Sequence, residues 1–343
     1  MTAGDFLCQA FLRGVRELDP ALLVRRRLPV VCKRAIAIGK AAQRMASVLP
    51  GDLPKLVISP YPGPGLQSTH PHLSMRSYEA GQALLDFVRG DGLSLFLLSG
   101  GASALVEVAP PGQDPGKWIA EWPELYRRGL DIVAMNQLRA SHSAIKAGGL
   151  LNYLQGPSLT WLLSDVLQGP RWVGSGLTWP EPRHVDHRLE VLADGLSLAQ
   201  AVAAQLQPTF DCLIEAPLLG DLEQALQAVQ GWAPAPGQAI LAPAEVTLAV
   251  QGPGTGGRCQ HLAARAISWL REQPYVLLAA ASDGADGPTA SAGAWVDGSF
   301  PDPTAYLERF DSYGYFGAIG RSWEPGPTGN NLNDLIILAH PRI

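Results

Sequence analysis

The chain has 343 residues, 47% of them apolar and 17% charged, with a formal net charge of −5. This composition excludes a disordered chain and provides material for one large or two moderate domains. The acidic balance and the lack of a dense basic face argue against a nucleic-acid partner. Four scattered cysteines and the absence of a membrane-length apolar run predict a cytoplasmic protein without a membrane partner. A homodimer remains possible.

The first half of the chain alternates helical and extended patterns. We expect an amphipathic helix over residues 4–26, a strand over 35–38 and a helix over 41–49. A strand over 55–59, a helix over 77–88 and a strand over 93–98 follow. The last of these strands is apolar almost throughout, as in a buried parallel sheet. These units predict an α/β fold with a parallel sheet.

The second half continues this alternation. We expect strands over 159–163, 245–250, 276–280 and 294–296. We expect helices over 189–205, within 218–244 and over 258–270. Trp232–Gly237, rich in Pro and Ala, is the best linker candidate. We therefore predict an N-terminal domain over 1–232 and a C-terminal domain over 238–343 that begins a second βαβ-type block. Clefts between such domains commonly bind small molecules.

Polar or small residues follow three of the predicted N-terminal strands, at Gly39-Lys40, Ser99–Ser103 and Ser164-Asp165. Ligands of open parallel sheets lie at the carboxyl ends of the strands, so these loops should converge. Gly100 and Gly101 would let the backbone approach an anion at the start of the next helix. A simple tight turn is the alternative interpretation.

In the C-terminal half, Gly252–Gly257 matches the dinucleotide-binding pattern GxGxxG. Pro253 removes a backbone donor from that turn, and no acidic residue ends a following strand at the required distance. A different phosphate-contacting loop is therefore favoured over an NAD site. Arg258 would add a cation suited to bidentate binding of a phosphate, unless it is an ordinary surface arginine.

Two further C-terminal segments carry carboxylates and amides. Asp283 and Asp286 lie in a glycine-rich turn and could hold Mg²⁺, although aspartates are also common turn formers. Gly326–Asp334 combines three asparagines with a carboxylate before a last apolar strand. The sequence contains neither a P-loop, nor a GxSxG elbow, nor HExxH, nor the protein-kinase signatures, and Ser143–Lys146 fits SxxK without its partner motifs.

Taken in order, these motifs resemble those of the glycerate 2-kinases whose C-terminal half is the MOFRL domain, a family often called hydroxypyruvate reductases. The matching stretches are Ala37–Ala42, Leu98–Leu105, Asn136–Arg139, Ser143–Lys146, Ser164–Val166, Gly174–Gly176, Gly256–Arg258, Ser282–Thr289 and Gly326–Asp334. The resemblance implies a Rossmann-like parallel-sheet N-terminal domain, a smaller α/β MOFRL-type C-terminal domain and an active site in the interdomain cleft. It also implies an ATP- and Mg²⁺-dependent enzyme that phosphorylates D-glycerate at O2 to give 2-phosphoglycerate.

The resemblance also assigns roles to residues of this chain. Catalytic roles fall to Lys40, Arg258 and Asp165. Substrate and phosphate binding falls to Ser99, Gly100, Gly101, Ala102, Ser103, Asn136, Arg139 and Lys146. Nucleotide binding in the C-terminal domain falls to Gly254, Gly256, Gly257, Thr328, Asn331, Asn333 and Asp334. The metal would be held by Asp283 and Asp286.

The chain departs from the family pattern at several positions. Cys259 and His261 replace the usual Asn and Glu after the arginine, Leu177 replaces a proline, and the sequence after His70 lacks the family's aspartate. The chain is also shorter than is usual for the family. Three alternatives therefore stay open: an NAD(P)H-dependent hydroxypyruvate reductase, a kinase of another small sugar acid, and a nucleotide-binding protein that has lost catalysis.

Overall fold

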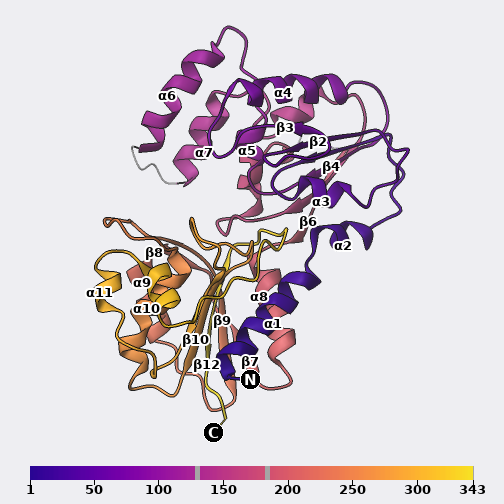
Figure 1. The fold of residues 1–343 in the computed structure, drawn as a ribbon. Coiled ribbons are helices and arrows are strands. Elements are labelled where there is room, and N and C mark those ends of the chain that lie inside the picture. The colour runs from indigo at the N-terminus through magenta and orange to yellow at the C-terminus, as the bar shows by residue number, and fades with distance from the viewer. Residues whose placement is uncertain (128–131, 182–185, 343) are drawn as a thin grey trace. The chain divides into compact units, whose positions relative to one another are not determined.

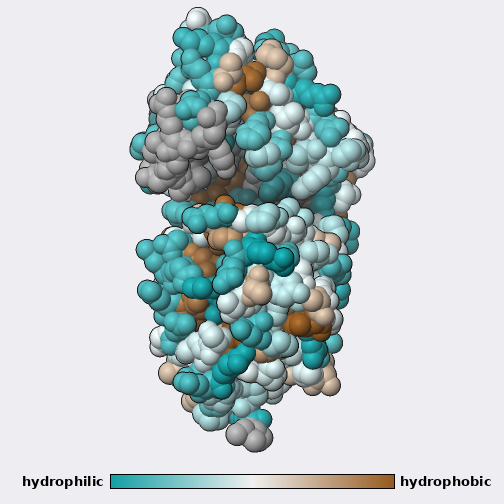
Figure 2. Space-filling view, turned by 60° about the vertical axis from the view of Figure 1, so that its left-hand side comes forward, coloured by the Kyte–Doolittle hydropathy of each residue, from teal (hydrophilic) through white to brown (hydrophobic). Residues whose placement is uncertain are grey.

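The computed structural model describes residues 1–127, 132–181 and 186–342, which form two compact units. Unit 1 comprises Met1–Asp19 and Ala193–Ile343, and unit 2 comprises Pro20–Leu192. Each unit contains one six-stranded sheet with helices packed against it (Figure 1). The face shown in Figure 2 is mainly hydrophilic, with separate apolar patches. No helix in the described part of the chain is long and apolar enough to cross a membrane.

The sheet of unit 2 has the strand order β3-β2-β1-β4-β5-β6. Its strands are β1 (Arg34–Ile38), β2 (Lys55–Ser59), β3 (Leu66–Gln67), β4 (Ser94–Leu98), β5 (Ser158–Leu163) and β6 (His187–Ala193). The pairs from β3 through β5 are all parallel, with Ile38 opposite Leu98 at the carboxyl ends of β1 and β4. All five residues of β4 are buried, because helices cover both faces of a parallel sheet. The predicted Rossmann-like N-terminal sheet is confirmed.

The helices of unit 2 are α2 (Pro20–Arg25), α3 (Ala42–Ala46), α4 (Met75–Phe87), α5 (Ala102–Leu105), α6 (Pro115–Arg127) and α7 (Ile132–Ser141), with short 3₁₀ turns η1 (Gly149–Tyr153) and η2 (Pro170–Ser175). Ser74 begins α4 with a capping box in which its hydroxyl accepts from the start of the helix. The main core lies between the sheet and these helices and includes Ile36, Phe96, Leu105 and Leu162.

The sheet of unit 1 is mixed, with the order β11-β10-β12-β9-β7 and β8 paired to β9. Its strands are β7 (Asp211–Ile214), β8 (Leu218–Asp221), β9 (Gln238–Thr247), β10 (Val276–Ala281), β11 (Gly293–Val296) and β12 (Asp334–Ala339). Its helices are α1 (Ala3–Glu17), α8 (Gly195–Leu206), α9 (Leu222–Gln230), α10 (Arg258–Leu270), α11 (Thr304–Leu307) and α12 (Ser312–Ala318). β12 lies between β9 and β10 and is antiparallel to both, whereas β8 and β9, which are connected through α9, pair in parallel as a βαβ unit.

The division into units differs from the expected boundary at the 232–238 linker. That linker lies inside unit 1, because β7 pairs in parallel with β9 on its far side, with Leu213 opposite Ile240. The helix α1 also belongs to unit 1, where a Cβ at Gly14 would meet the backbone of Val202 on α8. The chain therefore passes between the units at residues 19–20 and 192–193.

Three expected elements are divided or shifted in the structure. The helix expected over 4–26 ends at Glu17 and restarts as α2 at Pro20, since proline fits the first turn of a helix but not its interior. The helix expected over 189–205 is strand β6 followed by α8, which Asp194 caps through the Ser197 amide. β9 starts at Gln238 rather than at residue 245.

Candidate active site

The three polar loops of unit 2 converge at the carboxyl edge of its sheet, as predicted. The Ser99 amide donates to the carbonyl of Ile38 at 3.1 Å, and the Lys40 amide donates to the carbonyl of Gly100 at 2.9 Å. The Ser99 hydroxyl accepts from the Ala41 amide at 3.0 Å. These bonds join the loop after β1 to the loop after β4 because the two strands are parallel neighbours.

Glycines are required where these loops touch. A Cβ at Gly39 would collide with the hydroxyl of Ser99, and Gly39 has a φ of 133°, which side chains rarely adopt. A Cβ at Gly100 would collide with the carboxylate of Asp165, which follows β5. The Asp165 carboxylate therefore lies directly against the glycine loop.

His70 and Lys40 lie beside Gly101, which has a φ of 85°. The site that a Cβ would occupy there lies 3.0 Å from Cδ2 of His70 and 3.3 Å from Cγ of Lys40. Burial of the ring, followed by the positive charges of Lys40 and Arg139, lowers the pKa of His70 to about 4. A neutral imidazole whose pKa two nearby cations depress marks a place where an anion would be favoured.

His70 was not among the predicted site residues. Its signal in the sequence is the resemblance of His70-Pro71 to the family's histidine-proline segment.

Arg139 is held in place by two contacts. Its Nη1 donates to the hydroxyl of Ser103 at 3.1 Å, and that hydroxyl lies 2.6 Å from the hydroxyl of Ser175. Its guanidinium lies over the ring of Trp122, 4.4 Å from the centroid. The last turn of α7 thus presents a positioned guanidinium to the loop that follows β4. Asn136 belongs to the same helix, but its side chain lies outside the described residues.

Lys146 lies beneath this loop rather than at a surface. Its side chain is buried, and its ammonium donates to the carbonyls of Ser103 and Val106 at 2.8 Å each. Burial lowers the pKa of Lys146 to about 8, while the buried carboxylate of Glu107 opposes that shift. Lys146 and Glu107, the latter missed in the sequence, therefore support the backbone around α5 from inside the unit.

In unit 1, Arg258 and Asp334 form a bidentate ion pair, with Nε to Oδ2 at 2.5 Å and Nη2 to Oδ1 at 3.1 Å. Burial lowers the pKa of Arg258, but the Asp334 carboxylate outweighs this effect and raises it. The Arg258 side chain is 39% exposed and the Asp334 side chain 3%, so the carboxylate fixes a guanidinium that still reaches the surface.

This pair lines a cavity of about 550 Å³ in unit 1. Its walls include predicted residues from three segments of the chain, namely Gly256, Gly257, Arg258, Asp283, Asp286, Asn331, Asn333 and Asp334. Thr328 supports one of these walls, because its hydroxyl donates to the carbonyl of Ser282 at 2.6 Å. The structure therefore brings most of the predicted C-terminal residues together.

Asp286 caps a helix. Its two carboxylate oxygens accept from the amides of Cys259 and Gln260, at 3.0 and 2.8 Å, in the first turn of α10. A Cβ at Gly257 would collide with this carboxylate. Burial raises the pKa of Asp286 to about 7, although the two amide bonds oppose that shift. The N-terminus of α10 is therefore already capped by a carboxyl group supplied by the chain itself.

The glycine pattern at 252–257 is explained by packing within the unit. The Gly254 amide donates to the carbonyl of Arg309 at 2.8 Å, and a Cβ at Gly252 would meet the same carbonyl. The Thr255 amide donates to the carboxylate of Asp311 at 3.2 Å. Gly252 and Gly254 thus admit the 309–311 turn, which gives them a reason to be glycine without a phosphate.

The residues proposed for a metal offer one accessible carboxylate. Among the described residues, no group of three or more His, Cys, Asp or Glu side chains could hold a metal ion. The oxygens of Asp286 accept from α10, and those of Asp334 face Arg258. Asp283 is half-buried on the cavity wall, and Oδ1 accepts from the Ala285 amide. These residues fit an Mg²⁺ ion whose ligands are mainly phosphate oxygens of a bound nucleotide. They do not fit a metal site in which protein side chains supply all the ligands.

Comparison with known proteins places these features in a class. Residues 6–210 match the domain of unknown function DUF4147, and residues 238–334 match the MOFRL family. The chain belongs to the family of proteins that combine these two domains, and the predicted family is confirmed.

Within this family, the chain is similar to proteins named as glycerate 2-kinases. The D-glycerate 2-kinase of Thermotoga maritima is 30% identical, covering 95% of this chain and 93% of its own length. The glycerate 2-kinase of Sulfurisphaera tokodaii is 28% identical, covering 95% and 94%. The crystal structure of a Thermotoga maritima glycerate kinase superposes with a TM-score of 0.88 over 98% of this chain at 24% identity, which establishes the fold.

Proposed function

We propose that this protein is an ATP- and Mg²⁺-dependent kinase that transfers the γ-phosphoryl group of ATP to O2 of D-glycerate, giving 2-phosphoglycerate and ADP. The observation that carries the proposal is the cluster of Lys40, His70 and Arg139 around the Gly100-Gly101 loop. It is an anion-binding arrangement in a chain that is related over nearly its whole length to D-glycerate 2-kinases.

We assign substrate binding to unit 2. The carboxylate of glycerate would bind Arg139, whose guanidinium is already oriented by Ser103 and Trp122. Lys40 would approach the transferring phosphoryl group from the loop after β1. The Gly100 and Gly101 backbone, together with Ser99, Ala102 and Ser103 beside it, would shape the anion pocket. The buried Lys146 would position Ser103 instead of touching the substrate.

Phosphoryl transfer asks the protein mainly to position two anions and to neutralise charge. The O2 oxygen of glycerate forms a bond to the γ-phosphorus as the bond from that phosphorus to the β,γ-bridging oxygen breaks. The O2 proton passes to a base, for which we propose the Asp165 carboxylate beside Gly100. ADP leaves with the bridging oxygen.

Unit 1 is assigned to the nucleotide phosphates. Arg258, fixed by Asp334, would face the polyphosphate, with Gly256, Gly257, Asn331 and Asn333 lining the same cavity. Asp283 would supply one oxygen to Mg²⁺. When bound, this ion neutralises charge on the phosphate oxygens.

The reductase alternative loses its support in the structure. A dinucleotide-binding motif needs glycines open to the pyrophosphate and a helix N-terminus that can receive it. Here the 309–311 turn fills the space beside Gly252 and Gly254, and Asp286 occupies the first amides of α10. A negatively charged cofactor would have to displace that carboxylate.

Phosphorus NMR of ATP, Mg²⁺ and D-glycerate with the protein tests the proposal directly. We expect ATP signals to decline as a phosphomonoester on O2 grows, with no oxidation of NADH or NADPH by hydroxypyruvate in a parallel assay. If the protein transferred phosphate to another sugar acid in preference to D-glycerate, the assigned acceptor would be wrong and the kinase activity would stand. ATP binding without any transfer would show a protein that has lost catalysis, and turnover of NADH would overturn the proposal.

A further inference from the structure

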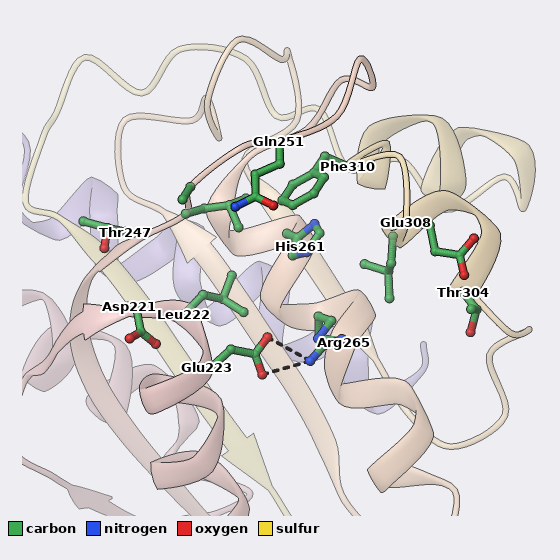
Figure 3. A pocket seen from close by; sticks show the side chains of 13 residues that line it. Asp221, Leu222, Glu223, Thr247, Gln251, His261, Arg265, Thr304, Glu308 and Phe310 are labelled. Carbon is green, nitrogen blue, oxygen red and sulfur yellow. Dashed lines mark hydrogen bonds and ion pairs between the residues drawn. The ribbon is translucent and has the colours of Figure 1, made fainter. Parts of the chain in front are cut away.

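A second cavity of unit 1 lies outside the set of residues assigned above. It has a volume of about 600 Å³. Its walls come from the start of α9, the end of β9 and the segment after it, the middle of α10, and α11 with the turn that follows (Figure 3). It shares Thr247 and Leu248 with the cavity that contains Arg258. The end of β9 therefore borders both cavities.

Two aromatic rings form one side of this second cavity. The ring of His261 stacks on the ring of Phe310, with centroids 5.2 Å apart and an angle of 15° between the planes. Phe310 has a φ of 58°, an unfavourable conformation for a bulky side chain that is held here by the bond from the Gly254 amide to the carbonyl of Arg309. Because this backbone conformation is unfavourable for phenylalanine, we infer that the position of the Phe310 ring serves a function.

His261 also carries an unsatisfied polar atom. The residue is 6% exposed, and its Nδ1 has no hydrogen-bond partner among the described residues. Burial, followed by the charge of Arg265, lowers its pKa, so the ring is neutral. A buried polar atom without a partner is costly, and a bound molecule that supplies one would recover that cost.

The charges of the cavity disfavour an anion. Among the described residues that line it, Asp221, Glu223 and Glu308 are acidic and Arg265 alone is cationic, and Arg265 is paired with Glu223 at 2.8 Å. The dashed contacts in Figure 3 show this pair closing the lower side of the cavity. A phosphate or a carboxylate would be repelled, whereas an uncharged ring with N–H and O–H donors would find carboxylate acceptors.

We propose that this cavity binds the adenine ring and ribose of ATP, with the base against Phe310 and His261 and the sugar hydroxyls facing the carboxylates. The polyphosphate would pass the end of β9 at Thr247 and Leu248 into the cavity that contains Arg258. The inference rests on the proposed kinase function for its choice of nucleotide. It gives the replacement of the family's glutamate by His261 a role as part of a stacking surface.

Adenosine, which lacks phosphates, is the probe that separates this proposal from the kinase function. We expect calorimetry to show adenosine binding to the intact protein, and we expect inorganic tripolyphosphate to compete with ATP without displacing adenosine. Phe310→Ala should weaken adenosine binding and raise the KM for ATP about tenfold, with the KM for D-glycerate within about twofold, because stacking on a base is commonly worth that much.

A second variant guards against misfolding at Phe310. Ala249 is exposed and lines this cavity but not the one with Arg258, so Ala249→Trp should block the base without disturbing the core. The matched control is Leu219→Trp, an exposed position on the neighbouring β8 outside both cavities. Wild-type adenosine affinity in folded Phe310→Ala and Ala249→Trp would overturn the proposal. The protein could bind adenosine but transfer no phosphate. If both variants then weakened adenosine binding, the result would support the adenosine site and contradict the proposed kinase function.

Discussion

Replacing Asp334 by asparagine tests whether a buried carboxylate orients the arginine proposed to face the polyphosphate. The substitution keeps the shape of the side chain but removes its charge and one acceptor from the bidentate pair with Arg258. Removing one partner of a fully buried ion pair costs about 3–5 kcal/mol. Because the Arg258 side chain is 39% exposed, solvent screens part of that loss, and we expect about 1–3 kcal/mol in the free energy of unfolding.

The effect on catalysis should be larger than the effect on substrate binding. An arginine that is present but no longer held in one orientation should lower kcat about 10- to 100-fold. Coupled assays of ADP release at saturating D-glycerate would measure kcat, and urea denaturation would measure stability. Arg258→Lys should resemble this variant, because lysine cannot form the planar bidentate pair.

The matched control is Glu190→Gln, which breaks the Arg27–Glu190 pair of unit 2, with Nε to Oε1 at 2.6 Å and the two side chains 28% and 47% exposed. There the loss should stay below about 1 kcal/mol, with kcat unchanged. An Asp334→Asn enzyme with the kcat of the wild type would refute the assigned role of the pair. A kcat loss of equal size in Glu190→Gln would show that the assay reports general destabilisation.

Three further predictions concern unit 2. Gly100→Ala should lower kcat by about 10-fold or more with normal secondary structure by circular dichroism, because the new Cβ displaces the Asp165 carboxylate proposed as the base; normal turnover would exclude that base. The His70 ring should titrate near pH 4 by NMR without ligand. A bound anion favours the imidazolium, so D-glycerate should raise that pKa and bind more tightly as the pH falls from 6.5 towards 4, and an unchanged titration would place the anion elsewhere. Lys146→Met should cost about 2–4 kcal/mol, because it removes two buried charge-assisted bonds to the carbonyls of Ser103 and Val106 and the nearby charge that favours the Glu107 carboxylate; adding Glu107→Gln should restore part of that loss, and no restoration would show that the two groups are not coupled.

The parts of the site that follow strands in a parallel sheet could be predicted from the sequence. Gly39 and Ser99 come directly after apolar runs, and Asp165 comes one residue later than that after β5; parallel pairing brings such positions to one edge regardless of their separation in the chain. The sequence indicates Arg258 and Asp334 as members of two separate motifs, but it does not indicate that they form an ion pair. Its geometry depends on β12 lying between β9 and β10, an order that no local pattern encodes.

Other features depend on contacts that are distant in sequence. Gly252 and Gly254 match a phosphate-binding pattern, yet the segment that fills the space beside them lies more than fifty residues later, at the 309–311 turn. β9 contains Pro243, a residue that is disfavoured inside a strand, so no local pattern marks residues 238–244 as part of it. On one edge, β9 pairs with β7 as far as Leu241 and with β8 from Ala244, so Pro243 lies in the gap between these partners, where its missing N–H costs nothing.

The position of α1 has a consequence for how the protein is made. Unit 1 is assembled from residues 3–17 and from sequence that begins only after unit 2 is complete, so α1 must wait for α8 to emerge before its apolar side can be covered. Since domains generally fold as units during synthesis, unit 2 should fold first, while the segment ahead of it stays exposed to chaperones and proteases. The final sheet also needs β12 between β9 and β10, so a premature stop before residue 334 should leave unit 1 without its central strand and unit 2 intact.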